Sequence, residues 1–352
     1  MAVYAIWNNK GGVGKSYLTF QIAAEYASQH PEKRVLVIDL CPQANASSML
    51  LGGIVAGEAA LGTIHTGNPR NTIAGYIEDR ILSPYVNPRT GANFVTQVST
   101  CNPQVPNNLY LVVGDEQLEI QASRVMSATF PGPQDAWRIV HTWVSDLIND
   151  IANRWDQADC TVFLDCNPSF SIYTELALAA ADRLIVPFSA DGSSKRAVRA
   201  VLSLVYGVTR QAGQQQSEFY LNSQRFRMST PKIYMYVGNR LTQANQSSAQ
   251  AFKTVVNEIG DEIYLVWQGS AGLFCVHPAG SPTPINKRTF KSMFQYEVND
   301  ANTASVVSGA LGVPIARLSA GRVNLLGRSV TVNQSQLDKQ VPNIISLVGS
   351  IE

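Results

Sequence analysis

Apolar residues along this chain form short, nearly unbroken runs that alternate with segments of helical periodicity. The runs occupy residues 3–7, 34–39, 109–113, 161–165, 184–188 and 233–237. Runs of this length are typical of parallel strands that are buried on both faces of a sheet. Between them, apolar residues recur every three or four positions, most clearly in residues 135–155, which predicts amphipathic helices. We therefore predict an α/β fold, with a doubly wound, mostly parallel sheet flanked by helices.

Two parts of the chain depart from this alternation. Residues 52–108 contain Gly, Pro, Thr and Asn between short apolar pieces, and we interpret them as a looped insertion in a single domain that spans residues 1–352. Residues 260–352 are interpreted as a divergent C-terminal elaboration. Within it, residues 267–290 resist assignment to any element. Residues 336–351 have helical spacing suited to packing on a protein core, although Pro342 favours a break or kink there.

The overall composition excludes several classes of protein. The chain has 352 residues, is 45% hydrophobic and carries a net charge of +1, which argues against a dedicated high-affinity nucleic-acid binder. No apolar run is long enough for a membrane span, and the immediate start of a strand leaves no room for a signal peptide, so we expect a cytoplasmic protein. The five cysteines form no CxxC pair, and we expect free thiols.

The segment between the first strand and the first helix carries the clearest chemistry. Residues 8–16 read NNKGGVGKS. Backbone N–H groups of such a glycine loop, together with the helix N-terminus behind it, surround phosphate oxygens. Lys15 would reach the β- and γ-phosphates, and the Ser16 hydroxyl would bind Mg²⁺. The general pattern asks for Gly where this chain has Asn9, and a second lysine, Lys10, follows. The predicted nucleotide contacts are Gly11, Gly12, Val13, Gly14, Lys15, Ser16 and Tyr17.

Polar residues follow three of the predicted strands. Asp39 and Asp165 end the runs 34–39 and 161–165, and Asn239 comes shortly after the run 233–237. Ligands of open α/β sheets bind beyond the carboxyl ends of the strands, so these side chains are expected near the glycine loop. Asp165 is the candidate that holds Mg²⁺ through water, with Asp39 as a second candidate. Each aspartate could instead cap a turn.

Together these runs resemble the ParA/MinD family of deviant Walker A ATPases. The matching runs, over about residues 2–240, are KGGVGKS from Lys10, VLVIDLCPQAN from Val35, FLDCNPS from Phe163 and AAADRLIVP from Ala179. The resemblance implies binding of ATP and Mg²⁺, ATP hydrolysis, and a homodimer in which Lys10 reaches the partner's nucleotide. It also implies that Asn239 contacts adenine, although Asn239 is equally compatible with a turn residue.

One position departs from the family. The second motif commonly has an aspartate before its proline, where this chain has Cys41. A thiol, with a pKa of about 8.5 when unperturbed, does not replace a carboxylate that orients water. We therefore hypothesise slow turnover, with Asp39 covering part of the catalytic role. The alternative is that Cys41 simply fills the turn.

The resemblance favours an ATP-dependent switch of ParA type that partitions or positions a plasmid, chromosome region or other cargo. Members of this branch bind nonspecific DNA through a basic face, for which Lys195, Arg196 and Arg199 are the candidates; these residues could equally form a solvated surface. An adaptor of ParB type, location on the nucleoid and no membrane partner are further expectations. The alternative function is an ATP-binding protein that regulates a partner complex, with slow or no hydrolysis and without DNA. An iron–sulfur carrier role is disfavoured because paired cysteines are absent.

Overall fold

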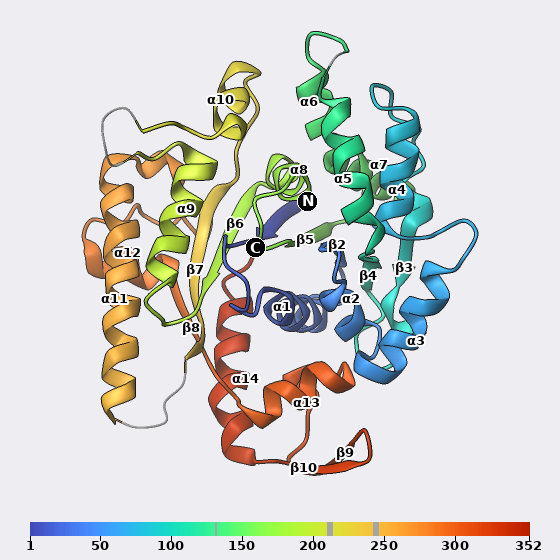
Figure 1. The fold of residues 1–352 in the computed structure, drawn as a ribbon. Coiled ribbons are helices and arrows are strands. Elements are labelled where there is room, and N and C mark those ends of the chain that lie inside the picture. Colours follow the sequence, from blue (N-terminus) through green and yellow to red (C-terminus); the bar gives the residue numbers. More distant parts are fainter. Residues whose placement is uncertain (131, 210–213, 242–245) are drawn as a thin grey trace.

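A central parallel sheet organises the molecule. The computed structural model describes residues 1–130, 132–209, 214–241 and 246–352. Within these ranges, the main sheet has eight strands in the order β3-β4-β2-β5-β1-β6-β7-β8, with helices on both faces (Figure 1). Strand β3 pairs antiparallel with β4, and the other described pairs of this sheet are parallel. The predicted α/β fold is therefore confirmed. The strands are β1 (Ala2–Ile6), β2 (Arg34–Leu40), β3 (Val95–Gln97), β4 (Leu109–Val112), β5 (Cys160–Cys166), β6 (Arg183–Phe188), β7 (Lys232–Leu241) and β8 (Gln295–Asn299).

The helices follow the strands in the order expected of a doubly wound fold. They are α1 (Lys15–Gln29), α2 (Asn45–Leu50), α3 (Gly53–His65), α4 (Ile73–Leu82), α5 (Gln117–Ala128), α6 (Ala136–His141), α7 (Trp143–Arg154), α8 (Ile172–Ala180), α9 (Ser194–Tyr206), α10 (Glu218–Arg225), α11 (Gln246–Gly269), α12 (Lys287–Phe294), α13 (Thr303–Leu311) and α14 (Gln334–Val348). No helix in the described ranges is long and apolar enough to cross a membrane.

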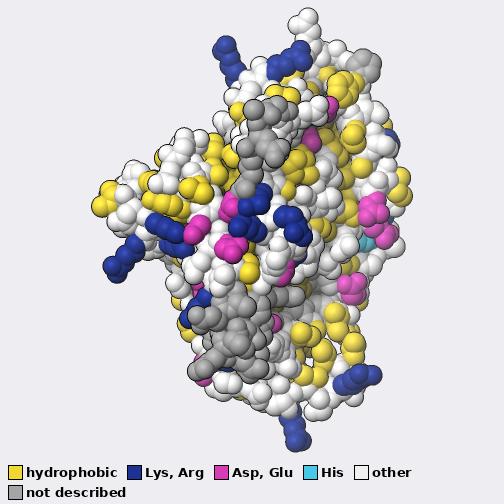
Figure 2. Space-filling model, turned by 60° about the vertical axis from the view of Figure 1, so that its left-hand side comes forward, with side chains coloured by type: hydrophobic (Ala, Val, Ile, Leu, Met, Phe, Trp, Pro, Cys, Tyr) yellow, Lys and Arg dark blue, Asp and Glu magenta, His cyan; other side chains and the backbone are white. Residues whose placement is uncertain are grey.

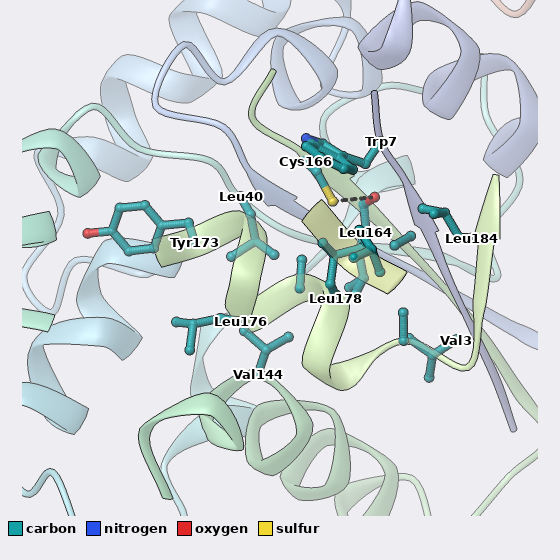
Figure 3. Packing of buried hydrophobic residues seen from close by; sticks show 14 of the residues in the cluster. Val3, Trp7, Leu40, Val144, Leu164, Cys166, Tyr173, Leu176, Leu178 and Leu184 are labelled. Carbon is teal, nitrogen blue, oxygen red and sulfur yellow. Dashed lines mark hydrogen bonds between the residues drawn. The ribbon is translucent and has the colours of Figure 1, made fainter. Parts of the chain in front are cut away.

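Two hydrophobic clusters cover the opposite faces of the sheet. Along β1, Val3 and Ala5 belong to one cluster, and Tyr4 and Ile6 belong to the other, as the two-residue period of a strand requires. Figure 3 shows the first cluster, in which Trp7 and residues of β5 and α8 pack together. The second cluster contains α1 and the apolar side of α14. Both faces of the sheet are therefore buried from solvent, which explains the unbroken apolar runs in the sequence.

The predicted helix over residues 135–155 is divided into α6 and α7. Thr142 separates the two helices, and its hydroxyl donates to the carbonyl oxygen of Ile139 at 2.7 Å. A threonine that bonds to its own backbone in this way competes with the regular helical pattern. The prediction of a single helix was thus wrong, but Trp137 and Trp143 both lie in the core, as the amphipathic pattern requires.

The C-terminal part contains more regular structure than its sequence suggested. The sequence predicted a break or a kink at Pro342; helix α14 continues through this residue, so the break is wrong, and the kink stays a prediction. Pro342 is exposed, while Leu337 before it and Ile344 after it are buried in the core, and this packing stabilises the helix on both sides of the proline. Residues 52–108 include α3, α4 and β3, and residues 267–290 include a short 3₁₀ turn, Ala271–Leu273, and the start of α12.

A separate two-stranded sheet lies between α13 and α14 in the sequence. It is an antiparallel hairpin of β9 (Gly321–Leu325) and β10 (Arg328–Val332). In Figure 1 the hairpin lies at the edge of the molecule, beyond α13 and away from the central sheet.

Candidate nucleotide-binding site

The glycine loop joins β1 to α1 and leaves open space in front of its backbone. Gly12 and Gly14 have φ values of 75° and 79°, in the left-handed region that favours glycine. A Cβ built on Gly11 or Gly12 would meet nothing within 4 Å. The N-terminus of α1 lies directly behind the loop, and its free N–H groups favour an anion. The loop therefore fits a phosphate group that approaches its backbone closely.

Lys15 and Ser16 lie at the C-terminal end of the loop. The Lys15 ammonium donates to the carbonyl oxygens of Lys10 at 2.7 Å and Asn8 at 3.2 Å, so the side chain folds back over the loop. Burial lowers the pKa of Lys15, and the Asp165 carboxylate partly opposes this shift. An ammonium that is already desolvated and directed at the cradle is well placed to bind phosphate oxygens.

Ser16 and Asp165 form the candidate metal site. The Ser16 hydroxyl donates to one carboxylate oxygen of Asp165 at 2.7 Å, and the Thr19 hydroxyl donates to the other at 3.0 Å. Asp165 is fully buried, and burial together with the Asp39 charge raises its pKa to about 7. Hydroxyl and carboxylate oxygens are the ligands that Mg²⁺ prefers, so the side chains present fit this ion. Thr19 was not predicted as part of the site, because its sequence context shows only a position on the helix.

Asp39 holds the backbone of the turn that follows β2. Its carboxylate accepts hydrogen bonds from the N–H groups of Cys41 at 3.0 Å and Ser47 at 2.9 Å, and from the Ser47 hydroxyl at 2.8 Å. Asp39 is fully buried, and burial raises its pKa to about 6. A Cβ on Gly114 would lie 2.8 Å from the Asp39 carboxyl carbon. Asp39 lies beside Asp165 in the register of β2 and β5, but its own hydrogen bonds point into the turn.

A cavity of about 540 Å³ lies in front of the loop, within the usual size of a small-molecule site. Its walls combine the loop with the turn after β2 and with two more distant helices, α3 and α13. The lining includes Gly12, Lys15, Ser16, Tyr17, Cys41, Gln43, Met49, Ile54, Glu58, Cys166, Ser305, Val306 and Gly309. The contributions of α3 and α13 were not predicted, because residues so far from the loop in sequence carry no local signal. Another cavity of about 540 Å³, beside α4 and α5, contains neither the glycine loop nor the strand-end aspartates, so the first cavity is the candidate nucleotide site.

Cys41 forms part of the wall of this cavity. Its side chain is 5% exposed, and burial, with the charges of Asp39 and Asp165, raises the pKa of the thiol to about 12. The thiol is therefore neutral at physiological pH. It cannot accept a proton as a carboxylate does.

Lys10 lies at the other end of the loop and points to a different part of the chain. Its ammonium donates to the hydroxyls of Ser189 at 3.0 Å and Ser194 at 3.2 Å and forms an ion pair with Asp191. Burial works against ionisation of Asp191, but hydrogen bonds from Lys10 and from two serines outweigh it and hold its pKa well below the usual range. Lys10 is absent from the lining of the nucleotide cavity. Its charge is thus held between β6 and α9, apart from the phosphate cradle of its own chain.

Asn239 braces the loop from β7. Its side-chain amide donates to the carbonyl oxygens of Val13 at 2.9 Å and Gly14 at 3.4 Å, and the residue is fully buried. The structure therefore brings Asn239 to the glycine loop, as the strand-end argument predicted. These two hydrogen bonds of its amide are to the loop backbone.

The candidate DNA-binding residues lie on α9 and face acidic residues of α11. Lys195 forms ion pairs with Glu258 at 3.0 Å and Glu262 at 3.6 Å, and Arg199 also pairs with Glu262. Arg196 lines a cavity of about 510 Å³ together with Asn9. Figure 2, which turns the α9 and α11 side forward, shows Lys and Arg side chains interleaved with Asp and Glu. This face is therefore of mixed charge.

Comparison with known proteins shows where this site belongs. The model of the family described as "AAA domain" matches residues 1–217. The chromosome partitioning protein ParA of Myxococcus xanthus is 27% identical over 189 residues, which cover 54% of this chain and 52% of that protein. A ParA family protein of Mycoplasma pneumoniae is 21% identical over 198 residues, 56% of this chain and 62% of that protein. The chain thus spans about half the length of the curated relatives it matches.

A solved structure extends the likeness in fold over the whole chain. The ATP complex of McdA from Cyanothece aligns with a TM-score of 0.57 and 14% identity, covering 100% of this chain and 98% of that one. At this identity the likeness concerns the fold alone. The family match, the two lysines of the glycine loop and the paired strand-end aspartates have one common explanation: the chain belongs to the AAA domain family and has the P-loop fold of ParA/MinD-like proteins.

Proposed function

We propose that this protein is an ATP-gated dimeric switch of ParA type, which partitions or positions a plasmid, chromosome region or other cargo. The observation that carries this proposal is the position of Lys10. Its ammonium lies outside the chain's own nucleotide cavity, on the same loop as the phosphate-binding Lys15. A cation in this position is available to a nucleotide across an interface, where it would stabilise charge on the γ-phosphate as an arginine finger does.

The residues of the cavity divide the binding of ATP and Mg²⁺ among them. The backbone of residues 11–14 and the Lys15 ammonium would bind the phosphates, and Ser16 and Asp165 would hold Mg²⁺, with Asp39 supporting the site through the turn that contains Cys41. Bound Mg²⁺ would neutralise charge on the phosphates. Tyr17 lines the cavity, and its hydroxyl donates to Gln340 of α14 at 2.7 Å. Asn239 would fix the loop, and its direct contact with adenine stays a prediction.

Slow hydrolysis follows from the chemistry of Cys41. The neutral thiol forms part of the cavity wall where the family commonly has a carboxylate. Asp39 is buried, and both of its oxygens accept hydrogen bonds from the turn, so it would reach an attacking water only after these bonds rearranged. We infer that ATP stays bound for long periods unless a partner, such as an adaptor of ParB type, completes the site.

Nonspecific DNA is the proposed surface on which the dimer acts. The name of the Myxococcus relative, a chromosome partitioning protein, supports this proposal. The mixed charge of the α9 face favours the alternative, in which the ATP state regulates a partner complex and no DNA is bound. On the first proposal the protein would associate with the nucleoid.

One titration separates the two functions. Binding of the wild-type protein to a nonspecific 30-bp duplex is measured by fluorescence anisotropy with ATP, with ADP and without nucleotide, over a series of salt concentrations. The partition function predicts binding that needs ATP and weakens steeply with salt, because phosphate contacts release counterions. Absence of binding with ATP even at low salt would leave the regulatory function as the better proposal.

A further inference from the structure

The β9–β10 hairpin has a different charge pattern from α9. Residues 315–333 contain Arg317, Arg322 and Arg328 and no Asp, Glu or Lys. Arg322 and Arg328 are exposed, and neither forms an ion pair in the part of the chain that the structure describes. By contrast, Lys195 and Arg199 of α9 are both paired with carboxylates. The hairpin is therefore a basic surface whose two exposed arginines have no ion-pair partner among the described residues.

The register of the hairpin separates an inward from an outward face. Val323 pairs with Val330, and these two side chains, with the buried Val332, pack against the core cluster that contains α13. The opposite face carries two cross-strand pairs, Arg322 with Thr331 and Asn324 with Ser329, and all four residues are exposed. Arg328, which pairs with Leu325 beside the tip, has the register of the inward face but is itself exposed. Arg, Asn, Ser and Thr are among the residue types that most often contact the phosphate backbone of DNA. A two-stranded ribbon also has the width to enter the major groove.

The tip of the hairpin supports a binding role independently. Leu325 pairs with Arg328, so Leu326 and Gly327 form a two-residue turn, with φ values of 51° and 77°. Such turns favour Asn or Asp at the first position, because few other residues tolerate the left-handed region. This chain instead has a leucine that is 70% exposed. An apolar residue in a strained and solvated position costs stability, and such outliers concentrate at binding surfaces.

The hairpin also packs on α13, which forms part of the wall of the nucleotide cavity. Val332 packs in the same cluster as Ala304 and Val307 of α13, and the other side of α13 lines the cavity through Ser305 and Gly309. A change in α13 when ATP binds would therefore be passed directly to the hairpin.

We propose that the β9–β10 hairpin is a DNA-binding arm, in which Arg322 on the outward face and Arg328 beside the tip contact backbone phosphates. This inference rests on the proposed partition function and assigns its DNA contact to a surface other than α9. A single exposed leucine is too small for the apolar face that membrane binding needs, and the polar outward face lacks the apolar centre of a protein interface. The charge complementarity instead fits a duplex.

The test compares the double variant Arg322→Ala/Arg328→Ala with a matched control, Arg89→Ala/Arg154→Ala. The control removes the same charge from two exposed arginines on the α7 side of the molecule. Both are measured with ATP on the nonspecific 30-bp duplex over a salt series. We expect the hairpin variant to lose at least about tenfold in affinity at low salt, and its log–log salt slope to fall by about 2, because each phosphate contact contributes about 0.9. The control and an Arg322→Lys/Arg328→Lys variant should bind nearly as the wild type does, and ATP-dependent dimerisation should be the same in all four proteins.

The outcomes separate this inference from the proposed function. If the wild type binds DNA with ATP and the hairpin variant has the same affinity and slope, the hairpin is not the arm, and the partition function stands. If the wild type binds anionic vesicles containing phosphatidylserine but no DNA, both the inference and the DNA-based function are overturned.

Discussion

The two lysines of the glycine loop, Lys10 and Lys15, make different contacts within the chain. Lys15 folds over its own loop and is 6% exposed, next to the metal candidates Ser16 and Asp165. Lys10 instead reaches across to Asp191 and two serines between β6 and α9. One end is therefore built to bind phosphate within the chain. The other end is held by a surface ion pair, which on the proposed function a nucleotide in a partner subunit would replace, because such pairs are individually weak.

Removal of Lys15 should have the largest effect. Lys15→Ala deletes a charged donor at the phosphate cradle, and such hydrogen bonds contribute about 1.5–3 kcal/mol. We expect ATP affinity to fall by roughly 10- to 150-fold, as measured by isothermal titration calorimetry. Lys10→Ala should leave ATP affinity nearly unchanged in the same assay. Equal losses in the two variants would remove the distinction between the ends of the loop.

Restoration of the family's aspartate should accelerate turnover. Cys41→Asp places a carboxylate on the cavity wall where the thiol is neutral. A positioned general base contributes about 10²–10⁴-fold when fully effective, and we expect about a tenfold rise in the steady-state rate of phosphate release. Cys41→Ser is the matched control and should stay slow. Equal and fast rates in the wild type and Cys41→Asp would contradict the hypothesis of slow turnover.

Weakening of the contact that holds Lys10 should have the smallest effect. Asp191→Asn keeps an oxygen for the Ser193 N–H but removes the ion pair with Lys10. Asp191 is 47% exposed, and exposed pairs contribute about 0.2–1 kcal/mol. ATP-dependent dimers should therefore form up to about fivefold more tightly, as measured by sedimentation equilibrium. Weaker dimerisation would mean that Asp191 supports the interface and does not compete with it.

The strands and the phosphate loop could be predicted from the sequence, because each depends on local patterns. Buried parallel strands leave unbroken apolar runs, and Asp165 and Asn239 stand near the loop because carboxyl ends of parallel strands share one edge. The contacts of Lys10 could not be predicted, since Asp191 is 181 positions away and adjacent in space only through the β1–β6 pairing. The neutralisation of α9 by α11 was missed for the same reason. Ion pairs between helices depend on their packing and leave no periodic signal.

The C-terminal third shows a second limit of sequence reasoning. Its helices α13 and α14 lie in the core, and α13 lines the nucleotide cavity, although the sequence there gave only a loose family resemblance. A wall of a cavity requires shape and small side chains, which many sequences provide. A phosphate cradle requires glycines and a lysine at fixed spacing, and few sequences meet that requirement.

Dimerisation of Lys10→Ala tests the central claim most directly. Molar mass is measured by light scattering after size exclusion, with saturating ATP and Mg²⁺, for the wild type and for Lys10→Ala. We predict that the wild type is a dimer with ATP and a monomer without it. Lys10→Ala should bind ATP and yet remain a monomer. A Lys10→Ala protein that dimerises with ATP as the wild type does, or a wild type that stays monomeric with ATP bound, would contradict the account.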